Sequence, residues 1–443
     1  MADGAGLKNR GKTRSDVEER RKAAEEFTGT ELTTIGNYGF EPELASKNIE
    51  NMIGTVQIPL GYAGPMKIAG DYANGEFLIP LATTEGALVA SISRGISVIS
   101  SSGGASTTVV SDAMTRAPVL KVDGIKHSKE VIAWIETHID EIDAAVAGTT
   151  SHGKLLSIEP FPDGRSLYLR FSYDTGDAMG MNMATIASEA VCRLLEKETG
   201  AAMVSVSGNM CSDKKPAAMN MINGRGKTVV AEARIPKDIV EGKLHATASA
   251  IVETNYRKNL VGSSMAGTLG ANAHAANMVA ALYIATGQDP AQVVGGSMAI
   301  TTCEDLDGDL YICVRMPTVE VGTVGGGTRL PCQREALSMI GCLGEGNARK
   351  LAEIVCTTVL AGELSTLAAQ AAGQLGAAHA ALGRRYYPYI RGRESPTHAC
   401  HKLQVQRPPH DARGRPAGDA GRAHPDDRRR HGRHRGGHRR DVR

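Results

Sequence analysis

The sequence predicts an α+β protein in which a small βαββαβ unit is inserted into a larger domain of mixed helices and strands. The length of 443 residues exceeds what one simple core needs, so more than one domain is expected. Hydrophobic patterning over 117–207 alternates between strand and helix in the order βαββαβ, which is the ferredoxin-like arrangement. We therefore predict a helical N-terminal region at 1–49, a large domain at 50–116 and 208–384, and a tail at 385–443.

Six segments make up the inserted unit. In chain order they are a strand at 119–122, an amphipathic helix at 128–147, strands at 155–159 and 167–173, a helix at 181–198 and a strand at 202–206. A Pro-Asp-Gly turn at 162–164 separates the two middle strands and predicts a hairpin between them.

The larger domain is predicted from the regions on both sides of this unit. Before it come a charged helix at 15–27, a buried helix at 84–99 and a loop of small residues at 100–108. After it come a helix whose first turn begins at Pro216, a strand at 228–235, a helical region at 236–285, strands at 310–316 and 319–321, a glycine loop at 322–328, and helices at 332–343 and 348–382.

Composition predicts a cytoplasmic globular protein. The hydrophobic fraction of 42% is typical of soluble domains. The sequence contains no run of 18 apolar residues, and residues 1–21 are charged and unlike a signal peptide. The eight cysteines form no C-x-x-C pair and no His/Cys spacing of a metal site, which favours reduced thiols and predicts no bound metal.

The net charge of +2 hides a strongly basic C-terminus. Residues 384–443 contain 17 Lys/Arg and 6 Asp/Glu, and no apolar periodicity survives there. Such a segment cannot bury a core, and its composition resembles a GC-rich reading frame translated out of register. A basic tail also permits nucleic-acid binding, but its arginine-rich half lacks interleaved aromatic residues and any known module, so we expect no specific nucleic acid partner.

The most informative local feature is the pair Lys214-Lys215 before Pro216 and two alanines. Proline is well tolerated in the first turn of a helix, so the lysines are predicted at the positive end of a helix dipole. Cations are disfavoured there unless an anion binds, which predicts an anion site. The alternative is a solvated lysine pair flanked by Asp213.

A second candidate site opens the helix at 181–198. Asp177, Met179, Gly180, Met181 and Asn182 combine a capping acid, a glycine and free backbone N–H groups, which suits a diphosphate. The segment is not a G-x-G-x-x-G fingerprint, and an ordinary capped helix start explains it equally.

Five further polar residues are candidates, each with an ordinary structural explanation. Glu85 fits the first turn of a helix, and Asp289 before a proline fits an N-cap. His379 is near the predicted end of a helix, where a histidine interacts favourably with the dipole. His274 and Asn277 fit a small-residue helix as polar core groups that find partners.

Taken together, these strings resemble the 3-hydroxy-3-methylglutaryl-coenzyme A (HMG-CoA) reductase family, in the class found in eukaryotes and archaea. The chain is most similar to the soluble archaeal form, from about residue 35 to 384. The matching strings lie at 50–54, 59–65, 82–86, 177–183, 207–220, 259–277, 287–289 and 322–328, and in the helix ending at His379.

The resemblance implies a specific reaction. The family makes mevalonate and free coenzyme A by a four-electron reduction of HMG-CoA with two NADPH, the first committed step of isoprenoid precursor synthesis by the mevalonate pathway. Glu85, Lys214, Asp289 and His379 are the implied catalytic residues. Lys214 is suited to the oxyanion, His379 to protonating the thiolate of coenzyme A, and Glu85 to supplying the alcohol proton. Asp289 is expected beside Lys214 and Glu85, holding the lysine charged.

The resemblance also implies binding residues. Those implied for the substrate are Arg116, Ser207, Asp213, Lys215, His274 and Asn277. Those implied for NADPH, in the inserted unit, are Ser151, His152, Asp177, Met179, Gly180, Met181 and Asn182. The string at 50–54 implies a dimer-forming element, and the family's active site is shared between the subunits of a homodimer or higher oligomer.

Two departures from the family pattern leave alternatives open. His152 stands where relatives often have an arginine for the 2′-phosphate of NADPH, so an enzyme that prefers NAD and oxidises mevalonate is one alternative. The tail replaces an ordinary short terminus after Arg384, so a protein that binds its ligands without turnover is another. The phosphorylatable serine of animal relatives has no counterpart at 383–385.

Overall fold

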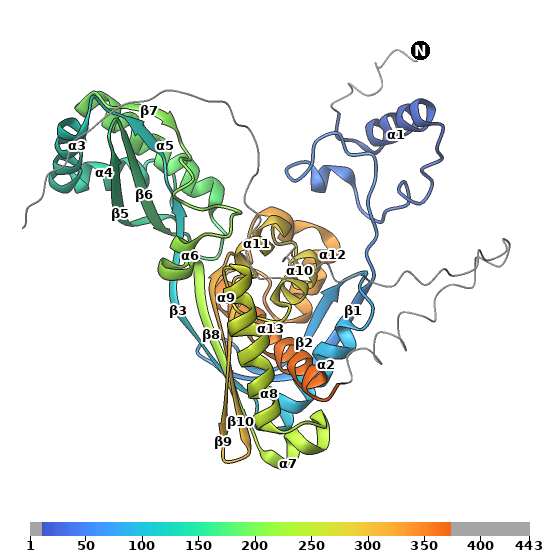
Figure 1. Cartoon of the computed structure of the whole chain (residues 1–443). Coiled ribbons are helices and arrows are strands. Elements are labelled where there is room, and N and C mark those ends of the chain that lie inside the picture. Colours follow the sequence, from blue (N-terminus) through green and yellow to red (C-terminus); the bar gives the residue numbers. More distant parts are fainter. Residues whose placement is uncertain (1–10, 374–443) are drawn as a thin grey trace, which may run out of the picture. The chain divides into compact units, whose positions relative to one another are not determined.

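The computed structural model describes residues 11–373. Residues 1–10 and 374–443 lie outside this range, and with them His379 and the predicted tail. Within it, the strands form a ten-stranded sheet whose two parts share the long strand β3 (Ala105–Arg116). Residues 106–113 of β3 pair with β8, and residues 114–116 pair with β6 (Figure 1). Strand β3 therefore carries Arg116 to the junction of the two parts.

The larger part of the sheet has the strand order β2-β1-β3-β8-β10-β9. Only the pairing of β1 with β3 is parallel among these described strands. Besides β3, its members are β1 (Leu60–Gly70), β2 (Asn74–Ala82), β8 (Arg225–Ile235), β9 (Ile300–Leu306) and β10 (Asp309–Val319). Along β8 and β10, buried apolar residues that face the core alternate with more exposed residues.

Helix α13 (Ala348–Ala371) forms the centre of the main core. It packs against α2 (Leu88–Ser101), α10 (Ala275–Thr286) and the strands β8 and β10. In the described chain α13 is the one helix long and apolar enough to cross a membrane, and 94% of its apolar window is buried inside the protein. A helix that is apolar on all sides and enclosed in this way is a core helix.

The inserted unit has the strand order β7-β4-β6-β5, all antiparallel. This is the ferredoxin-like order, so the predicted βαββαβ arrangement is confirmed. Its elements are β4 (Val119–Lys121), α3 (Ile125–Thr137), α4 (Ile139–Ala147), β5 (Lys154–Asp163), β6 (Ser166–Asp174), α5 (Met181–Thr199) and β7 (Ala202–Ser205). A second core of buried apolar residues lies between this sheet and its helices.

The N-terminal region contains α1 (Arg14–Thr28) and a 3₁₀ turn at Pro42–Ala45. A capping box of Thr13 and Asp16 starts α1, and Gly29 ends it in the left-handed conformation. The predicted charged helix is thus confirmed. Its buried face packs on a small cluster that includes Met52.

Several predicted elements were wrong at their limits. The helix predicted at 84–99 begins at Leu88, and the predicted loop at 100–108 overlaps β3. The helix predicted at 128–147 is two helices that meet at His138. Strands β1, β2 and β9 were missed because small and polar residues weaken their alternation. The strand predicted at 310–316 and the first residue of the one predicted at 319–321 belong to the single strand β10, which ends at Val319.

The helical region predicted at 236–285 consists of three helical runs, 237–244, 248–266 and 275–286, and the first two change between α- and π-helix without a gap. Their elements are α7 (Lys237–Ile239), a π-helix at Val240–Leu244, α8 (Ala248–Thr254), a π-helix at Asn255–Gly262, α9 (Ser263–Ala266) and α10. The remaining helices are α6 (Ala218–Asn223), a 3₁₀ turn at Pro290–Gln292, α11 (Val293–Gly296), a 3₁₀ turn at Gly326–Arg329 and α12 (Pro331–Met339). All described residues lie in one compact unit, so the predicted domain boundaries stay predictions.

Candidate active site

The predicted lysine pair lies in a strained loop and not in the first turn of a helix. Helix α6 begins at Ala218, and Pro216 belongs to the preceding loop, so that prediction was wrong. Asn209, Ser212 and Lys214 all have positive φ, three of the seven such non-glycine residues in the described chain. Strain of this kind is costly, and it often accompanies functional sites.

Lys214 forms an ion pair with Asp289. Its Nζ lies 2.8 Å from Asp289 Oδ2, and the two side chains are 45% and 28% exposed. The other oxygen, Oδ1, accepts a hydrogen bond from the Ala291 N–H and caps the 3₁₀ turn that follows. The N-cap interpretation of Asp289 is therefore correct, and the carboxylate also holds an accessible cation.

The side chain of Asp213, next to Lys214, is less exposed and makes more polar contacts. Its carboxylate lies 3.0 Å from Arg225 and 3.7 Å from Arg116, and it accepts a hydrogen bond from Gln292. Lys215 Nζ donates to the backbone carbonyl of Asp213 at 3.1 Å. In the same loop, the Ser207 hydroxyl lies 3.5 Å from Cys211 Sγ. The predicted substrate residues Arg116, Ser207, Asp213 and Lys215 are thus brought together.

A second chain of polar contacts links Glu85 to α13. Glu85 lies in the turn before α2 and accepts a hydrogen bond from Asn277 at 3.3 Å, and its predicted closeness to Asp289 stays a prediction. Asn277 also lies 3.3 Å from His274 Nδ1. His274 Nε2 lies 2.6 Å from the Thr366 hydroxyl. Nε2 also lies 3.3 Å from the Gly362 carbonyl oxygen, so with Nε2 protonated the imidazole donates to Thr366 and Gly362 and accepts from Asn277.

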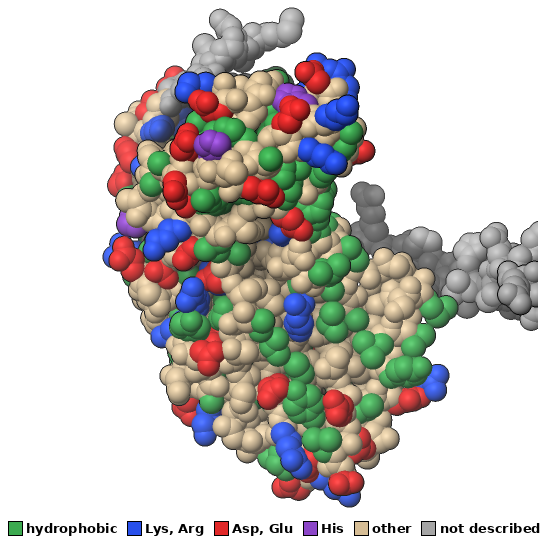
Figure 2. All heavy atoms as spheres, turned by 90° about the vertical axis from the view of Figure 1, so that its left-hand side faces the viewer, with side chains coloured by type: hydrophobic (Ala, Val, Ile, Leu, Met, Phe, Trp, Pro, Cys, Tyr) green, Lys and Arg blue, Asp and Glu red, His purple; other side chains and the backbone are tan. Residues whose placement is uncertain are grey.

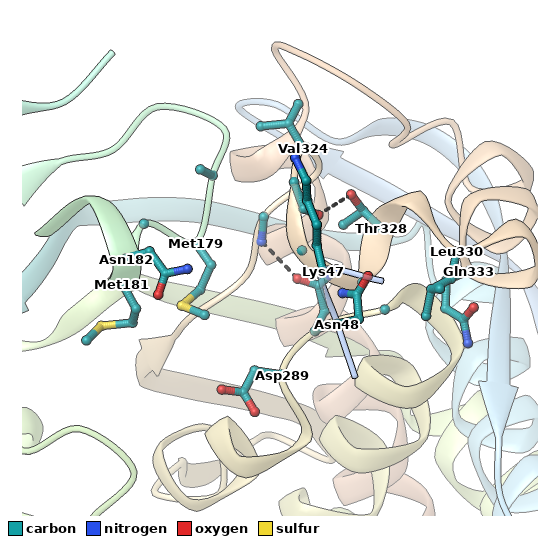
Figure 3. A pocket seen from close by; sticks show the side chains of 18 of the residues that line it. Lys47, Asn48, Met179, Met181, Asn182, Asp289, Val324, Thr328, Leu330 and Gln333 are labelled. Carbon is teal, nitrogen blue, oxygen red and sulfur yellow. Dashed lines mark hydrogen bonds between the residues drawn. The ribbon is translucent and has the colours of Figure 1, made fainter. Parts of the chain in front are cut away.

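Asp289 also faces a pocket of about 730 Å³. Figure 3 shows Met179, Met181 and Asn182 on one side of it and Leu330 and Gln333 on the other. Its wall is rich in glycine, and the glycines that line it are Gly180, Gly287, Gly322, Gly325, Gly326 and Gly327. A Cβ on Gly325 or Gly326 would meet no atom within 4 Å, so the backbone there is open to a ligand.

The backbone N–H groups of α5 open onto the same pocket. Gly180, the N-cap, has positive φ and leaves the start of the 19-residue helix without a side-chain cap. Asp177 was predicted to cap this helix, but its carboxylate accepts hydrogen bonds from the N–H groups of Gly346 and Ala348 at the start of α13. Its carbonyl oxygen accepts one from Thr323, which ties the α5 loop to the glycine loop.

Ser151 and His152 lie on the exposed loop between α4 and β5 and do not line the pocket. The loop nevertheless touches the pocket wall. A Cβ on Gly153 would lie 2.5 Å from Met183 Sδ, and Met183 lines the pocket. The predicted role of Ser151 and His152 in cofactor binding therefore stays a prediction, supported by the closeness of their loop to the pocket wall.

Sequence reasoning missed three residues that support this site. Arg225, Glu320 and Gln288 are buried, and Gln288 accepts a hydrogen bond from the Gly322 N–H at the start of the glycine loop. Charged residues at the start of a strand that is otherwise largely buried, such as Arg225 in β8, are the available signal.

The family model for hydroxymethylglutaryl-coenzyme A reductase matches residues 16–384 of the chain. The chain belongs to the hydroxymethylglutaryl-coenzyme A reductase family. It is 53% identical to 3-hydroxy-3-methylglutaryl-coenzyme A reductase of Haloferax volcanii over 83% of this chain and 93% of the relative. It is 55% identical to the enzyme of the same name from Pyrococcus horikoshii, over 84% and 93%.

The fold agrees with a class II hydroxymethylglutaryl-coenzyme A reductase from Streptococcus pneumoniae, a structure bound to NADPH. The TM-score is 0.61 at 20% identity, covering 80% of this chain and 86% of that one. Members of the hydroxymethylglutaryl-coenzyme A reductase family are oxidoreductases that reduce HMG-CoA to mevalonate with NADPH. The predicted family, fold class and reaction are thus confirmed.

Proposed function

We propose that this chain reduces HMG-CoA to mevalonate and coenzyme A with Lys214, Asp289, Glu85 and His379 as its catalytic residues. The observation that carries the assignment is the 2.8 Å ion pair of Lys214 and Asp289 at the glycine-lined pocket. A cation held by a carboxylate, in a loop with strained backbone, is a preorganised partner for an oxygen that becomes negative.

In this proposal Lys214 stabilises negative charge on the thioester carbonyl oxygen of the substrate. Arg116 and Lys215 bind its carboxylate end, since both adjoin the Asp213 loop. Glu85 donates the proton to the alcohol oxygen and is oriented by Asn277. His379, outside the described residues, protonates the thiolate of coenzyme A.

The pocket fits NADPH by its backbone. The uncapped start of α5 offers N–H groups to a phosphate, and the open glycines at 325–326 admit a flat ring close to the main chain. When bound, NADPH supplies the hydride. Met179, Met181 and Asn182 would hold it from one side, and Ser151 and His152 from the neighbouring loop.

We further propose a cytoplasmic homodimer. The segment after the 50–54 string exposes apolar side chains along one stretch, with Val56 82%, Leu60 58% and Tyr62 63% exposed. Contiguous exposed apolar residues are typical of protein interfaces.

The described cysteines are all free, which suits a reducing compartment. Figure 2 shows acidic and basic side chains interspersed on the face in view, unlike the basic stripe of a nucleic-acid site.

The test is NADPH oxidation on adding HMG-CoA. Lys214→Ala is expected to lower kcat about 100-fold or more, the size found for removing an oxyanion partner. Lys129→Ala, at an exposed position on α3, serves as the matched control and should keep the wild-type rate. A Lys214→Ala protein that keeps more than about a tenth of kcat would exclude Lys214 from the role assigned to it.

A further inference from the structure

A buried arginine, Arg225, lies beneath the junction of the two candidate binding regions. It is the first residue of β8, and its side chain is 0% exposed. Glu320, which follows β10, is 1% exposed and pairs with it at 2.9 Å. Burying both charges costs several kcal/mol for each ion, which the attraction between them only partly offsets. A buried pair of this kind is therefore weak evidence of stabilisation.

The guanidinium group of Arg225 divides its hydrogen bonds between the two regions. Nη2 lies 3.0 Å from Asp213 Oδ1, in the loop of the substrate candidates. The same nitrogen donates to Met181 Sδ at 2.6 Å, at the first turn of α5 and in the pocket wall. Nη1 contacts Gln292, which in turn donates to Asp213 at 3.0 Å. One side chain thus links the substrate loop, the cofactor helix and the turn after Asp289.

The backbone around this cluster leaves room for it. A Cβ on Gly295 would lie 2.9 Å from Glu320 Oε1, and one on Gly226, which has φ of +64°, would lie 3.1 Å from Glu320 Cγ. Glu320 Oε2 and Arg225 Nε have no hydrogen-bond partner among the described residues. Incomplete hydrogen bonding in a buried pair is unfavourable, so its presence calls for a reason other than stability.

We propose that Arg225, held by Glu320, is a positioning residue that fixes the substrate loop and the cofactor helix in one geometry. This inference rests on the proposed function, because it takes Asp213 as a substrate residue and Met181 as a cofactor residue. Arg225 itself does not line the pocket. A substitution of Arg225 is therefore expected to weaken the binding of both HMG-CoA and NADPH, whereas a substitution of Asp213 or Met181 should weaken the binding of only one of them.

The experiment compares KM values of purified variants. Arg225→Lys keeps the charge but replaces the planar fork of five N–H donors by one compact ammonium group, which cannot keep the contacts to both regions and to Gln292 and Glu320 at once. We expect the KM values for HMG-CoA and NADPH to rise together by about 10-fold, the effect of losing one charged hydrogen bond. Asp213→Asn is expected to raise only the KM for HMG-CoA, and Met181→Leu only that for NADPH. Glu320→Gln, of nearly the same shape, should raise both KM values by about 3-fold, and it replaces Arg225→Lys if that variant does not fold.

Lys227→Met is the matched control for a purely structural role. Lys227 is another buried cation of β8, paired with Asp112 at 3.1 Å. Its loss should lower Tm and leave both KM values unchanged. If Arg225→Lys and Glu320→Gln behave like Lys227→Met, or raise only one KM, Arg225 is not a positioning residue. Equilibrium binding of coenzyme A and NADP⁺ repeats the comparison without turnover, so an inactive wild-type protein would refute the proposed function and not this inference.

Discussion

Lys214 Nζ lies 2.8 Å from Asp289 Oδ2, and a second contact joins the same two segments of the chain. Asp213, before Lys214, accepts a hydrogen bond from Gln292, three residues after Asp289. Two adjacent side chains of a strained loop are therefore fastened to one 3₁₀ turn. This double fastening restricts the rotation of the lysine, because a flexible loop alone would leave a long side chain in many rotamers.

Asp289→Asn should separate the two functions of this carboxylate. An asparagine still accepts from the Ala291 N–H, so the cap is kept, but the negative charge beside Lys214 is lost. We expect kcat to fall about 100-fold with little change in the free energy of unfolding.

Asp289→Ala is the companion variant. It should lose the same activity and, in addition, about 1 kcal/mol of stability, because the cap is removed. Steady-state kinetics and urea unfolding measure the two effects. Equal stability of the two variants would show that Oδ1 contributes nothing as a cap.

Thr366→Val should disturb the substrate side of the site through His274. The hydroxyl lies 2.6 Å from His274 Nε2, and valine has the same shape without an acceptor. The imidazole would then lose the shorter of its two Nε2 contacts and keep only the one to the Gly362 carbonyl oxygen, so the Nδ1 contact with Asn277 is held less firmly. We expect the KM for HMG-CoA to rise by about 5-fold to 20-fold, with the KM for NADPH unchanged.

Thr358→Val provides the control on the same helix. Its hydroxyl bonds only to the Ile354 carbonyl within α13, and it is fully buried. Both KM values should be those of the wild type. A Thr366→Ser variant, which keeps the hydroxyl, should restore the KM for HMG-CoA.

The inserted unit was predicted well because its elements carry strong local signals. The hairpin turn after β5 and the amphipathic pattern of α5 need no distant partner to be recognised. Strand β9 and the hairpin β1–β2 gave weak signals, because glycine, proline, exposed apolar residues and polar residues interrupt their alternation. The break at His138 follows from local backbone geometry that periodicity does not reveal.

The sequence predicted which residues belong to the site but not the contacts between them. The resemblance named Lys214, Asp289 and Asp213, but their mutual contacts arise from the pairing of segments about 75 residues apart. The prediction that Asp177 caps α5 was wrong because the partners of its carboxylate, at the start of α13, lie about 170 residues away. Arg225 and Glu320 were missed because the sequence does not reveal which charged side chains are buried, and these two lie 95 residues apart in the sequence.

His152→Arg should sharpen the choice of cofactor. His152 is exposed on the loop beside Met183, where the 2′-phosphate of NADPH is predicted to lie. Guanidinium binds phosphate in a bidentate manner and is always charged, whereas imidazole offers one weaker contact. The ratio of kcat/KM for NADPH to that for NADH should rise about 10-fold. An unchanged ratio would place the 2′-phosphate elsewhere.

Gly95→Ala should weaken the main core. Gly95 of α2 faces α13 so closely that a Cβ would lie 1.9 Å from the Ala361 carbonyl oxygen. Since that atom belongs to the backbone of a buried helix, the helices must separate, at a cost of about 2–3 kcal/mol. Gly242→Ala is the control, because a Cβ there meets nothing within 4 Å. Urea unfolding would contradict the prediction if both variants had the same midpoint.

Glu320 should make stability depend on pH. Burial raises the pKa of Glu320 from 4.5 to about 7. Between these values the folded protein binds one more proton than the unfolded chain, so stability falls as pH rises through this window by about 1.4 kcal/mol per pH unit, or about 3 kcal/mol in all. The contribution is complete below pH 4.5 and lost above pH 7.

Glu320→Gln cannot titrate, so its free energy of unfolding should fall less between pH 5 and 8 than that of the wild type. Glu130→Gln, at an exposed position on α3, is the control and should keep the wild-type slope. Urea unfolding at pH 5, 6, 7 and 8 measures the difference, and parallel curves for Glu320→Gln and the wild type would show that Glu320 takes up no proton on folding.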